Sequence, residues 1–351
     1  MEELYMRINT NISAMDTLRN LNAATTAKSD SLAKLSSGSR INKAGDDAAG
    51  LAISENMKSQ ISGMSQATRN AQDGVSLIQT AEGALSESQA MIERMRDLSV
   101  QSANSTLSDS DRQDIQKEFG ALQSEITRVS KDTEFNNKNL LSGNNTFSFQ
   151  IGANAGQTLS VSISDMSASG LSIDSLSLVA SSTEVSAVQT AASAVAAITS
   201  GSTATLTTTD LANLSKIGVD TSSLTTSSTW SDVSSDVVAN AKTLTTDKTA
   251  AQETADISKA SEAITALTSA VGQVSGQRAD LGAAQNRLTH TINNLGTTSE
   301  NLSDANSQIR DVDMASEMTT FTKENILTQA ATSMLSQANS MPNTVLTLLQ
   351  V

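Results

Sequence analysis

Few side chains in this sequence could carry acid–base, nucleophilic or metal chemistry, and their spacing builds no catalytic site. His290 is the only histidine and the chain has no cysteine, so thiolate chemistry and His/Cys metal sites lack their ligands. The HExxH and GxSxG motifs are absent. Asp46 and Asp47 lie in a Gly- and Ala-rich turn, where carboxylates usually cap helices. The sequence therefore predicts a non-enzyme without metal or cofactor.

The charged residues indicate a solvated surface rather than a binding site for polyanions. Arg94 and Arg96 lie beside Glu93 and Asp97, a pattern typical of a charge-mixed helix face. The formal net charge of −14 argues against nucleic acid and anionic membranes as partners. No segment reaches the roughly 18 apolar residues of a membrane span. The N-terminus also lacks the basic and apolar regions of a cleaved secretory signal.

The elements that must carry these residues are long helices with narrow apolar seams. Aromatic residues make up only 2% of the chain, and Pro342 is the single proline, so little interrupts a helix. The strongest pattern lies in the C-terminal third, where seven consecutive heptad positions are all aliphatic. These seam residues are Leu267, Val274, Leu281, Leu288, Leu295, Leu302 and Ile309. They predict a helix from Ile257 to Ile309. The second apolar position of each heptad, here called the companion position, includes Ile264, Val271 and Ile292.

The N-terminal third carries three shorter helical patterns. A stripe from Ile8 to Leu21 precedes a turn-rich segment with Gly38, Gly45 and Gly50. The second helix has a strict seven-residue repeat made of Met57, Met64, Ala71, Ile78, Leu85 and Ile92. After the loop NSTLSDSD, in which Ser108 and Asp111 resemble a capping box, a third helix carries Ile115, Phe119, Leu122, Ile126 and Val129.

The middle of the chain changes character. FSFQIG and TLSVSIS alternate apolar and polar residues, which predicts two strands joined by a turn containing Gly156. The stretch 171–250 is dominated by Ser, Thr and Ala, and its low complexity leaves its fold open. Asp311 and Asp313 precede a last apolar stripe that begins at Met314, and they could cap its helix. The predicted fold is mainly α: a long antiparallel helical coiled-coil or bundle rod formed by the N- and C-terminal segments, with a small β-hairpin region and a variable central insert.

Both ends of the sequence resemble bacterial flagellin, the subunit of the flagellar filament. The N-terminal resemblance lies in INTNISAMDTLRNLN, LSSGSRINKAGDDAAGLAISENM, NAQDGVSLIQTAEGALSE and RMRDLSVQSAN. The C-terminal resemblance runs from RADLGAAQNRLTHTINNLG through SQIRDVDMASEM to LSQANSMPNTVLTLL. Together these segments cover about two thirds of the chain. Relatives usually begin near MRINTN, which makes Met6 a second candidate for the native start beside Met1.

The resemblance implies a segment map and a set of partners. The segments are 1–42 (inner-tube helix), 43–170 (rod helices and hairpin), 171–250 (variable exposed insert), 251–309 (rod helix) and 310–351 (inner-tube helix). The implied product is a secreted homopolymer, the extracellular filament of the bacterial flagellum, which serves swimming motility. The implied route is the flagellar type III export apparatus, with an export chaperone at the C-terminal segment and with filament cap and hook-junction proteins as partners.

The resemblance also implies a site read by a host receptor, Toll-like receptor 5. Its contact positions fall on Arg94, Leu98 and Glu118, and an exposed leucine flanked by two charges would form a small apolar anchor. Two alternatives stay open for the whole chain. One is a hook–filament junction protein of the same superfamily, and the other is a secreted helical adhesin.

Overall fold

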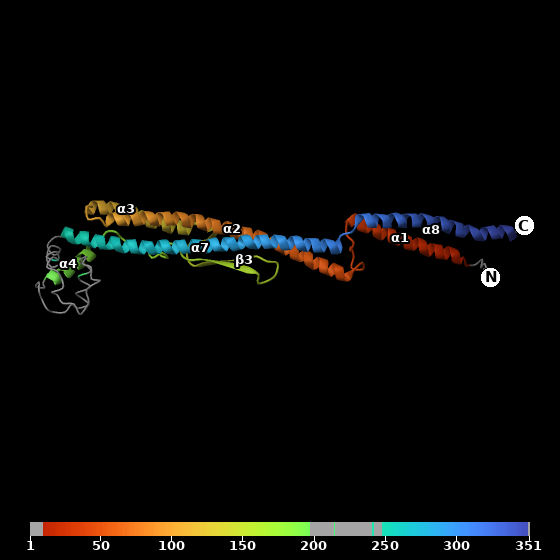
Figure 1. Ribbon diagram of the computed structural model, residues 1–351, viewed down its shortest axis with the longest axis horizontal. Coiled ribbons are helices and arrows are strands. Elements are labelled where there is room, and N and C mark those ends of the chain that lie inside the picture. The colour runs from red at the N-terminus through yellow and green to blue at the C-terminus, as the bar shows by residue number, and fades with distance from the viewer. Residues whose placement is uncertain (1–9, 197–213, 215–240, 242–247, 350–351) are drawn as a thin grey trace. The chain divides into compact units, whose positions relative to one another are not determined.

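The structure is a computed structural model that describes residues 10–196, 214, 241 and 248–349 (Figure 1). The predicted mainly α fold is confirmed. The helices are α1 (Ile12–Ser37), α2 (Ala48–Ser102), α3 (Asp109–Asp132), α4 (Ser182–Ala196), α7 (Lys248–Arg310) and α8 (Met314–Leu349). The strands are β1 (Glu134–Phe135), β2 (Lys138–Asn139), β3 (Asn145–Gln150) and β4 (Thr158–Ile163). The C-terminal seam helix therefore begins nine residues before its predicted start at Ile257 and ends one residue later.

The chain forms two compact units that are described separately. Unit 1 comprises Met1–Arg69, Ile151–Gln157 and Asn293–Val351, and unit 2 comprises Asn70–Gln150 and Thr158–Ile292. The division falls inside α2 and α7, so each of these helices contributes to both units. These limits differ from the five segments implied by the flagellin resemblance, which stay a prediction.

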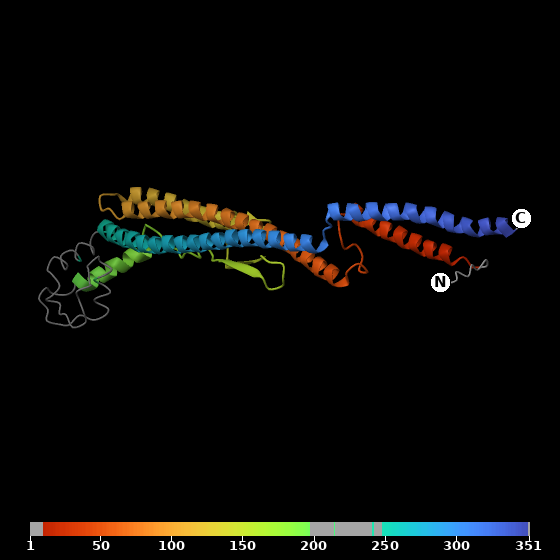
Figure 2. The same ribbon diagram turned by 45° about the vertical axis from the view of Figure 1, so that its right-hand side comes forward.

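Unit 2 is a helix bundle built on the aliphatic seams of α2, α3 and α7. In both ribbon views α7 runs alongside α2, and Arg278 Nη1 of α7 donates to Gln89 Oε1 of α2 at 2.7 Å (Figures 1 and 2). Gly74 allows a close approach here, because a Cβ at this position would lie 3.2 Å from Phe149 and 3.3 Å from Leu288. The fully buried residues include Ile78, Leu85, Ile92, Phe119, Ile126, Leu267, Val274, Leu281 and Leu288. The predicted seams of α2 and α7 thus form the core of this unit.

Two of the companion positions predicted for the α7 seam are wrong by one residue, and the third, Ile292, is half-buried like the preceding Thr291. Ile264 and Val271 are only half-buried, whereas the preceding residues, Ala263 and Ala270, are fully buried. The same buried row continues through Gln277 and Ala284. The physical reason is that small side chains let helix backbones come close together, so the buried row carries alanine rather than large apolar residues.

The predicted hairpin is present in unit 2 as β3 and β4. The strands pair antiparallel, with Phe147 opposite Val161. Leu159, Val161 and Ile163 alternate inward along β4 and are buried. Gln277 of α7 forms two hydrogen bonds with the backbone at the end of β4. Its Nε2 donates to Ser162 O at 3.0 Å, and its Oε1 accepts from Ser164 N at 3.1 Å. A buried amide on the helix seam therefore holds the hairpin against α7.

Unit 1 contains the two terminal helices, which lie side by side and antiparallel (Figures 1 and 2). Lys28 Nζ donates to Asn325 Oδ1 at 2.8 Å, and Asn11 Nδ2 donates to Ala338 O at 2.8 Å. Ala24 and Ser31 are the buried residues of α1, so the contact between the helices uses small side chains. The predicted pairing of the two ends of the chain is therefore observed.

The connectors between the terminal helices and the long helices are tied to each other. Arg40 N donates to Arg310 O at 2.6 Å, and Val312 N donates to Gly38 O at 3.1 Å. Gly38 ends α1 with a φ of 70°, in the left-handed region that favours glycine. Asp47 Oδ1 accepts from Gly50 N at 2.9 Å, which confirms the predicted helix-capping role in this turn. The turn-rich segment after α1 is thus hydrogen-bonded through its backbone to the connector between α7 and α8.

Candidate assembly surfaces

The most distinctive surface of the described chain is a set of large apolar side chains exposed on the terminal helices. Twelve large apolar side chains are exposed among the described residues, and ten of them belong to α1 and α8. They are Ile12, Met15, Leu18 and Leu32 on α1, and Met314, Met318, Ile326, Leu327, Met334 and Met341 on α8. Exposed apolar surface of this extent is typical of a protein interface. The pair α1 and α8 therefore presents a candidate self-association surface.

Part of this surface is a shallow groove on α8. The groove is lined by Met318, Thr319, Thr322, Lys323, Ile326 and Leu327. Ile326 is 60% exposed although it is among the most apolar residues of the helix. The groove's mostly apolar surface fits a neighbouring helix better than a small polar ligand, since its lining residues come from successive turns of one helix.

The local signals that start α8 agree with the sequence. Asp313 Oδ1 accepts from Ala315 N at 2.9 Å and from Ser316 N at 3.2 Å, so Asp313 caps the helix as predicted. Asp311 does not share this role, because its Oδ2 accepts from Ser307 Oγ at 2.6 Å in the preceding helix. Asp313 is therefore the cap of α8, whereas Asp311 bonds to Ser307 in the last turn of α7.

The three residues implied as receptor contacts are only partly assembled into a surface site. Arg94 Nε of α2 donates to Glu118 Oε1 of α3 at 2.9 Å, and both side chains are about half exposed. Leu98, however, is 1% exposed. The expectation of an exposed leucine anchor is wrong, because Leu98 faces the core of unit 2. The exposed apolar residue on this part of α2 is Val100, at 55%.

The predicted seam residues behave differently along α7. Leu267, Val274, Leu281 and Leu288 are fully buried in unit 2. In unit 1, Leu295 is 8% exposed and packs with Met64 and Ala67, while Leu302 and Ile309 are only half-buried. Seam burial therefore weakens toward the C-terminal end of the helix.

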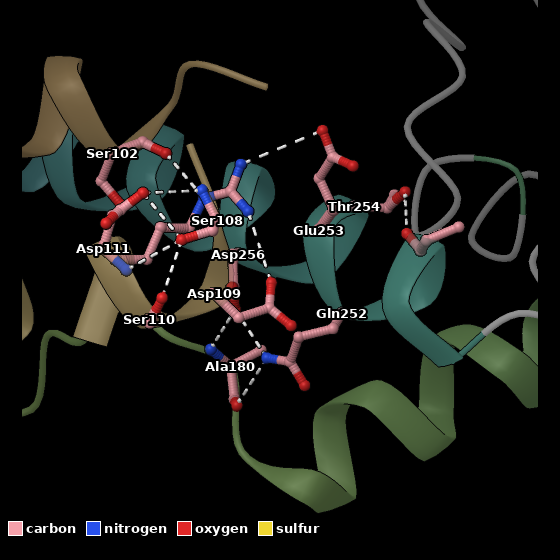
Figure 3. Close-up of polar contacts among 12 residues, drawn as sticks. Ser102, Ser108, Asp109, Ser110, Asp111, Ala180, Gln252, Glu253, Thr254 and Asp256 are labelled. Atoms are coloured by element: carbon pink, nitrogen blue, oxygen red, sulfur yellow. Dashed lines mark hydrogen bonds and ion pairs between the residues drawn. The ribbon is translucent and has the colours of Figure 1, made fainter. Parts of the chain in front are cut away.

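A buried polar cluster in unit 2 was missed by sequence reasoning (Figure 3). Arg112 of α3 is 1% exposed, and its guanidinium donates to Ser102 O at 3.2 Å and to Asn104 O at 3.0 Å. The carboxylate of Asp109 lies 3.8 Å from Arg112 Nη1, and that of Glu253 lies 4.0 Å from Arg112 Nη2. Arg112 thus closes the loop between α2 and α3, where Ser108 and Asp111 form the predicted capping box.

Asp256 of α7 anchors the chain as it enters α4. Its Oδ1 accepts from Ala180 N at 2.6 Å and from Gln252 Nε2 at 2.8 Å, while its Oδ2 has no hydrogen-bond partner among the described residues (Figure 3). Burial raises the pKa of the Asp256 carboxyl above its usual value, and the donors at Ala180 and Gln252 oppose this shift. Asp256 lies seven residues before Ala263 and so belongs to the same buried row of α7 as Ala263 and Ala270. A prediction that identified this row would also have predicted that Asp256 is buried.

The remaining candidates for chemistry form no site in the described part of the chain. His290 is exposed on α7, as predicted for a solvated helix histidine. Within the described ranges, no three His, Asp or Glu side chains come together as a group that could hold a metal ion. In the same ranges, none of the helices is both long and apolar enough to cross a membrane.

Comparison with known proteins identifies both helical ends. Residues 8–146 match the model of the bacterial flagellin N-terminal helical region, and residues 264–349 match that of the C-terminal helical region. The chain is 43% identical to a flagellin of Bacillus subtilis (strain 168) over 358 aligned residues, which cover 98% of this chain and all of that protein. The chain belongs to the bacterial flagellin family. Flagellins are a structural protein family, which agrees with the prediction of a non-enzyme.

The chain is also similar to a second named protein and to a solved structure. The chain is 38% identical to the flagellar filament 33 kDa core protein of Treponema phagedenis, with 98% of this chain and all of that protein aligned. A three-dimensional structure of FliC from Burkholderia pseudomallei aligns at 27% identity with a TM-score of 0.39, covering 61% of this chain and 99% of that chain. The two family models match the two ends of the chain, over residues 8–146 and 264–349.

Proposed function

We propose that the chain is a structural subunit that polymerises with copies of itself into a bacterial flagellar filament. The observation that carries this proposal is the set of large apolar side chains exposed on α1 and α8 in a chain with net charge −14. A soluble monomer gains nothing from these exposed side chains, whereas a polymer would bury them against neighbouring subunits, with a gain of about 25 cal/mol for each Å² of apolar surface. Membership of the flagellin family points to the same role.

A seeding experiment tests the assembly. Purified chain is mixed with short filament seeds in ammonium sulfate and viewed by electron microscopy. Long helical filaments are expected. A chain that only joins the ends of preformed filaments would instead be a hook–filament junction protein, and a chain that stays monomeric while binding surfaces would be an adhesin. A truncated chain lacking the residues after Asp313 is the matched control, which should stay folded in unit 2 and form no filaments.

The same function includes export from the cell. We propose that the subunit leaves through the flagellar type III apparatus, that an export chaperone covers α8 beforehand, and that cap and hook-junction proteins contact the growing polymer. The apolar groove around Ile326 supports chaperone binding, because this surface needs cover before assembly. Deletion of the export apparatus should leave the chain inside the cell, whereas secretion that continues without the apparatus would contradict the route.

A second proposal concerns recognition of the monomer by Toll-like receptor 5. Support comes from the Arg94–Glu118 pair, which offers two half-exposed charged side chains on adjacent helices. Leu98 would act only by supporting the backbone beneath Arg94, since it is buried. Arg94→Ala should weaken receptor activation by monomer, and Arg96→Ala, an exposed arginine on the same helix, is the control. Equal signalling by the Arg94→Ala monomer and the parent would remove this proposal and leave the filament role intact.

A further inference from the structure

Asn11 connects α1 to α8 through its side-chain amide. The Oδ1 of Asn11 accepts from Ala14 N at 3.0 Å and caps α1. Its Nδ2 donates to Ala338 O of α8 at 2.8 Å. Because the cap requires the oxygen to face the backbone of α1, the nitrogen is the end that faces α8. One side chain therefore starts one terminal helix and binds the other.

The acceptor on α8 is available because of the single proline in the chain. In an α-helix the carbonyl of residue 338 would accept from the N–H of residue 342. Residue 342 is Pro342, which has no N–H, and α8 continues through this position from Met314 to Leu349. Ala338 is 7% exposed, so its carbonyl oxygen is largely shielded from water. Asn11 supplies the donor that the helix itself lacks.

We propose that Asn11 and Pro342 together set the axial register of α1 against α8. Carbonyls one turn away from Ala338 have their own helical N–H donors, so a shifted α1 would leave the Asn11 amide without this open acceptor and Ala338 O without a donor. The Lys28–Asn325 hydrogen bond lies further along the same antiparallel pair and reports the same register. Asn11 is thus a positioning residue for assembly. This inference rests on the proposed filament function only in treating the register as important for polymerisation.

A double-mutant cycle tests the proposal through Asn11→Ser and Pro342→Ala. Serine caps helices about as well as asparagine but is too short to reach α8, so only the inter-helix bond is removed. We expect Asn11→Ser to raise the critical concentration for polymerisation by about fivefold in the parent chain. In the Pro342→Ala background, residue 342 supplies the missing N–H, and the same change should have an effect of less than about twofold.

A second readout follows the register directly. The chain has no cysteine, so Lys28→Cys with Asn325→Cys creates a single possible disulfide within one chain, which is separated from disulfides between chains by its size on a non-reducing gel. Asn11→Ser should lower the yield of the intramolecular disulfide, and Pro342→Ala should abolish that dependence. Equal effects of Asn11→Ser in both backgrounds, or no effect in either, would overturn the proposal. A parent chain that forms no filaments would instead refute the proposed function, while the disulfide yield would still decide the register.

Discussion

Truncation of Leu288 offers the most direct test of how unit 2 is packed. Leu288 is 0% exposed, and its Cδ1 lies close to the backbone of α2 at Gly74. Leu288→Ala removes three buried carbons and leaves a cavity between two long helices that cannot easily collapse. We expect it to lower the free energy of unfolding of unit 2 by about 3 kcal/mol. For a unit of this size, the midpoint of thermal unfolding should fall by about 6–12 °C.

A partner mutation at Gly74 makes the test specific. Alanine at position 74 would place a Cβ 3.3 Å from Leu288 Cδ1 and 3.2 Å from Phe149 Cδ1. In the parent chain this crowding opposes the gain of about 1 kcal/mol that alanine brings to a helix interior. When Leu288 is already alanine, one of the two close contacts is gone. We therefore expect Gly74→Ala to be more favourable, by about 1 kcal/mol, in the Leu288→Ala background than in the parent.

Urea unfolding followed by far-ultraviolet circular dichroism measures both effects in the monomer. Thr289→Ala, an exposed substitution one residue away, is the control and should change the free energy of unfolding by less than about 0.5 kcal/mol. If Leu288→Ala were as mild as Thr289→Ala, the seam would not be the core of unit 2. If the effects of Gly74→Ala and Leu288→Ala were additive, the two residues would not share the contact that the structure shows.

Three further outcomes follow from the structure. Burial raises the pKa of Asp256, so its ionised form is penalised in the folded state, and Asp256→Asn should stabilise unit 2 at pH 7. This advantage should be lost as the pH falls toward 3.8, because the carboxyl then becomes protonated. If Asp256→Asn destabilised unit 2 as much as Asp256→Ala in urea unfolding at pH 7, this reasoning would be wrong. Ile326→Asp should leave unfolding of the monomer unchanged but block polymerisation seen by light scattering, whereas Ser333→Asp on the same helix should polymerise. Asp313→Ala should destabilise α8 by about 1 kcal/mol, seen as faster amide exchange at Ala315 and Ser316, with slow exchange at both counting against the cap.

The sequence alone determined the class of the protein, its helical seams and its local caps. A seven-residue repeat is a property of one helix, so Leu267 through Leu288 could be recognised without knowing what they pack against. The caps at Ser108 and Asp313 are equally local, because donor and acceptor lie within one helical turn. The alternation of Leu159, Val161 and Ile163 identified a strand for the same reason.

Only the tertiary structure decided which partners these elements meet. Leu98 carries the same apolar character whether it faces solvent or the core, and only the position of neighbouring helices buries it. The companion row of α7 holds alanine because of the close approach of other helices, which no propensity encodes. The bond from Asn11 to Ala338 joins residues 327 positions apart. Such a contact depends on how two helices align, and that alignment is a property of the folded pair rather than of either segment.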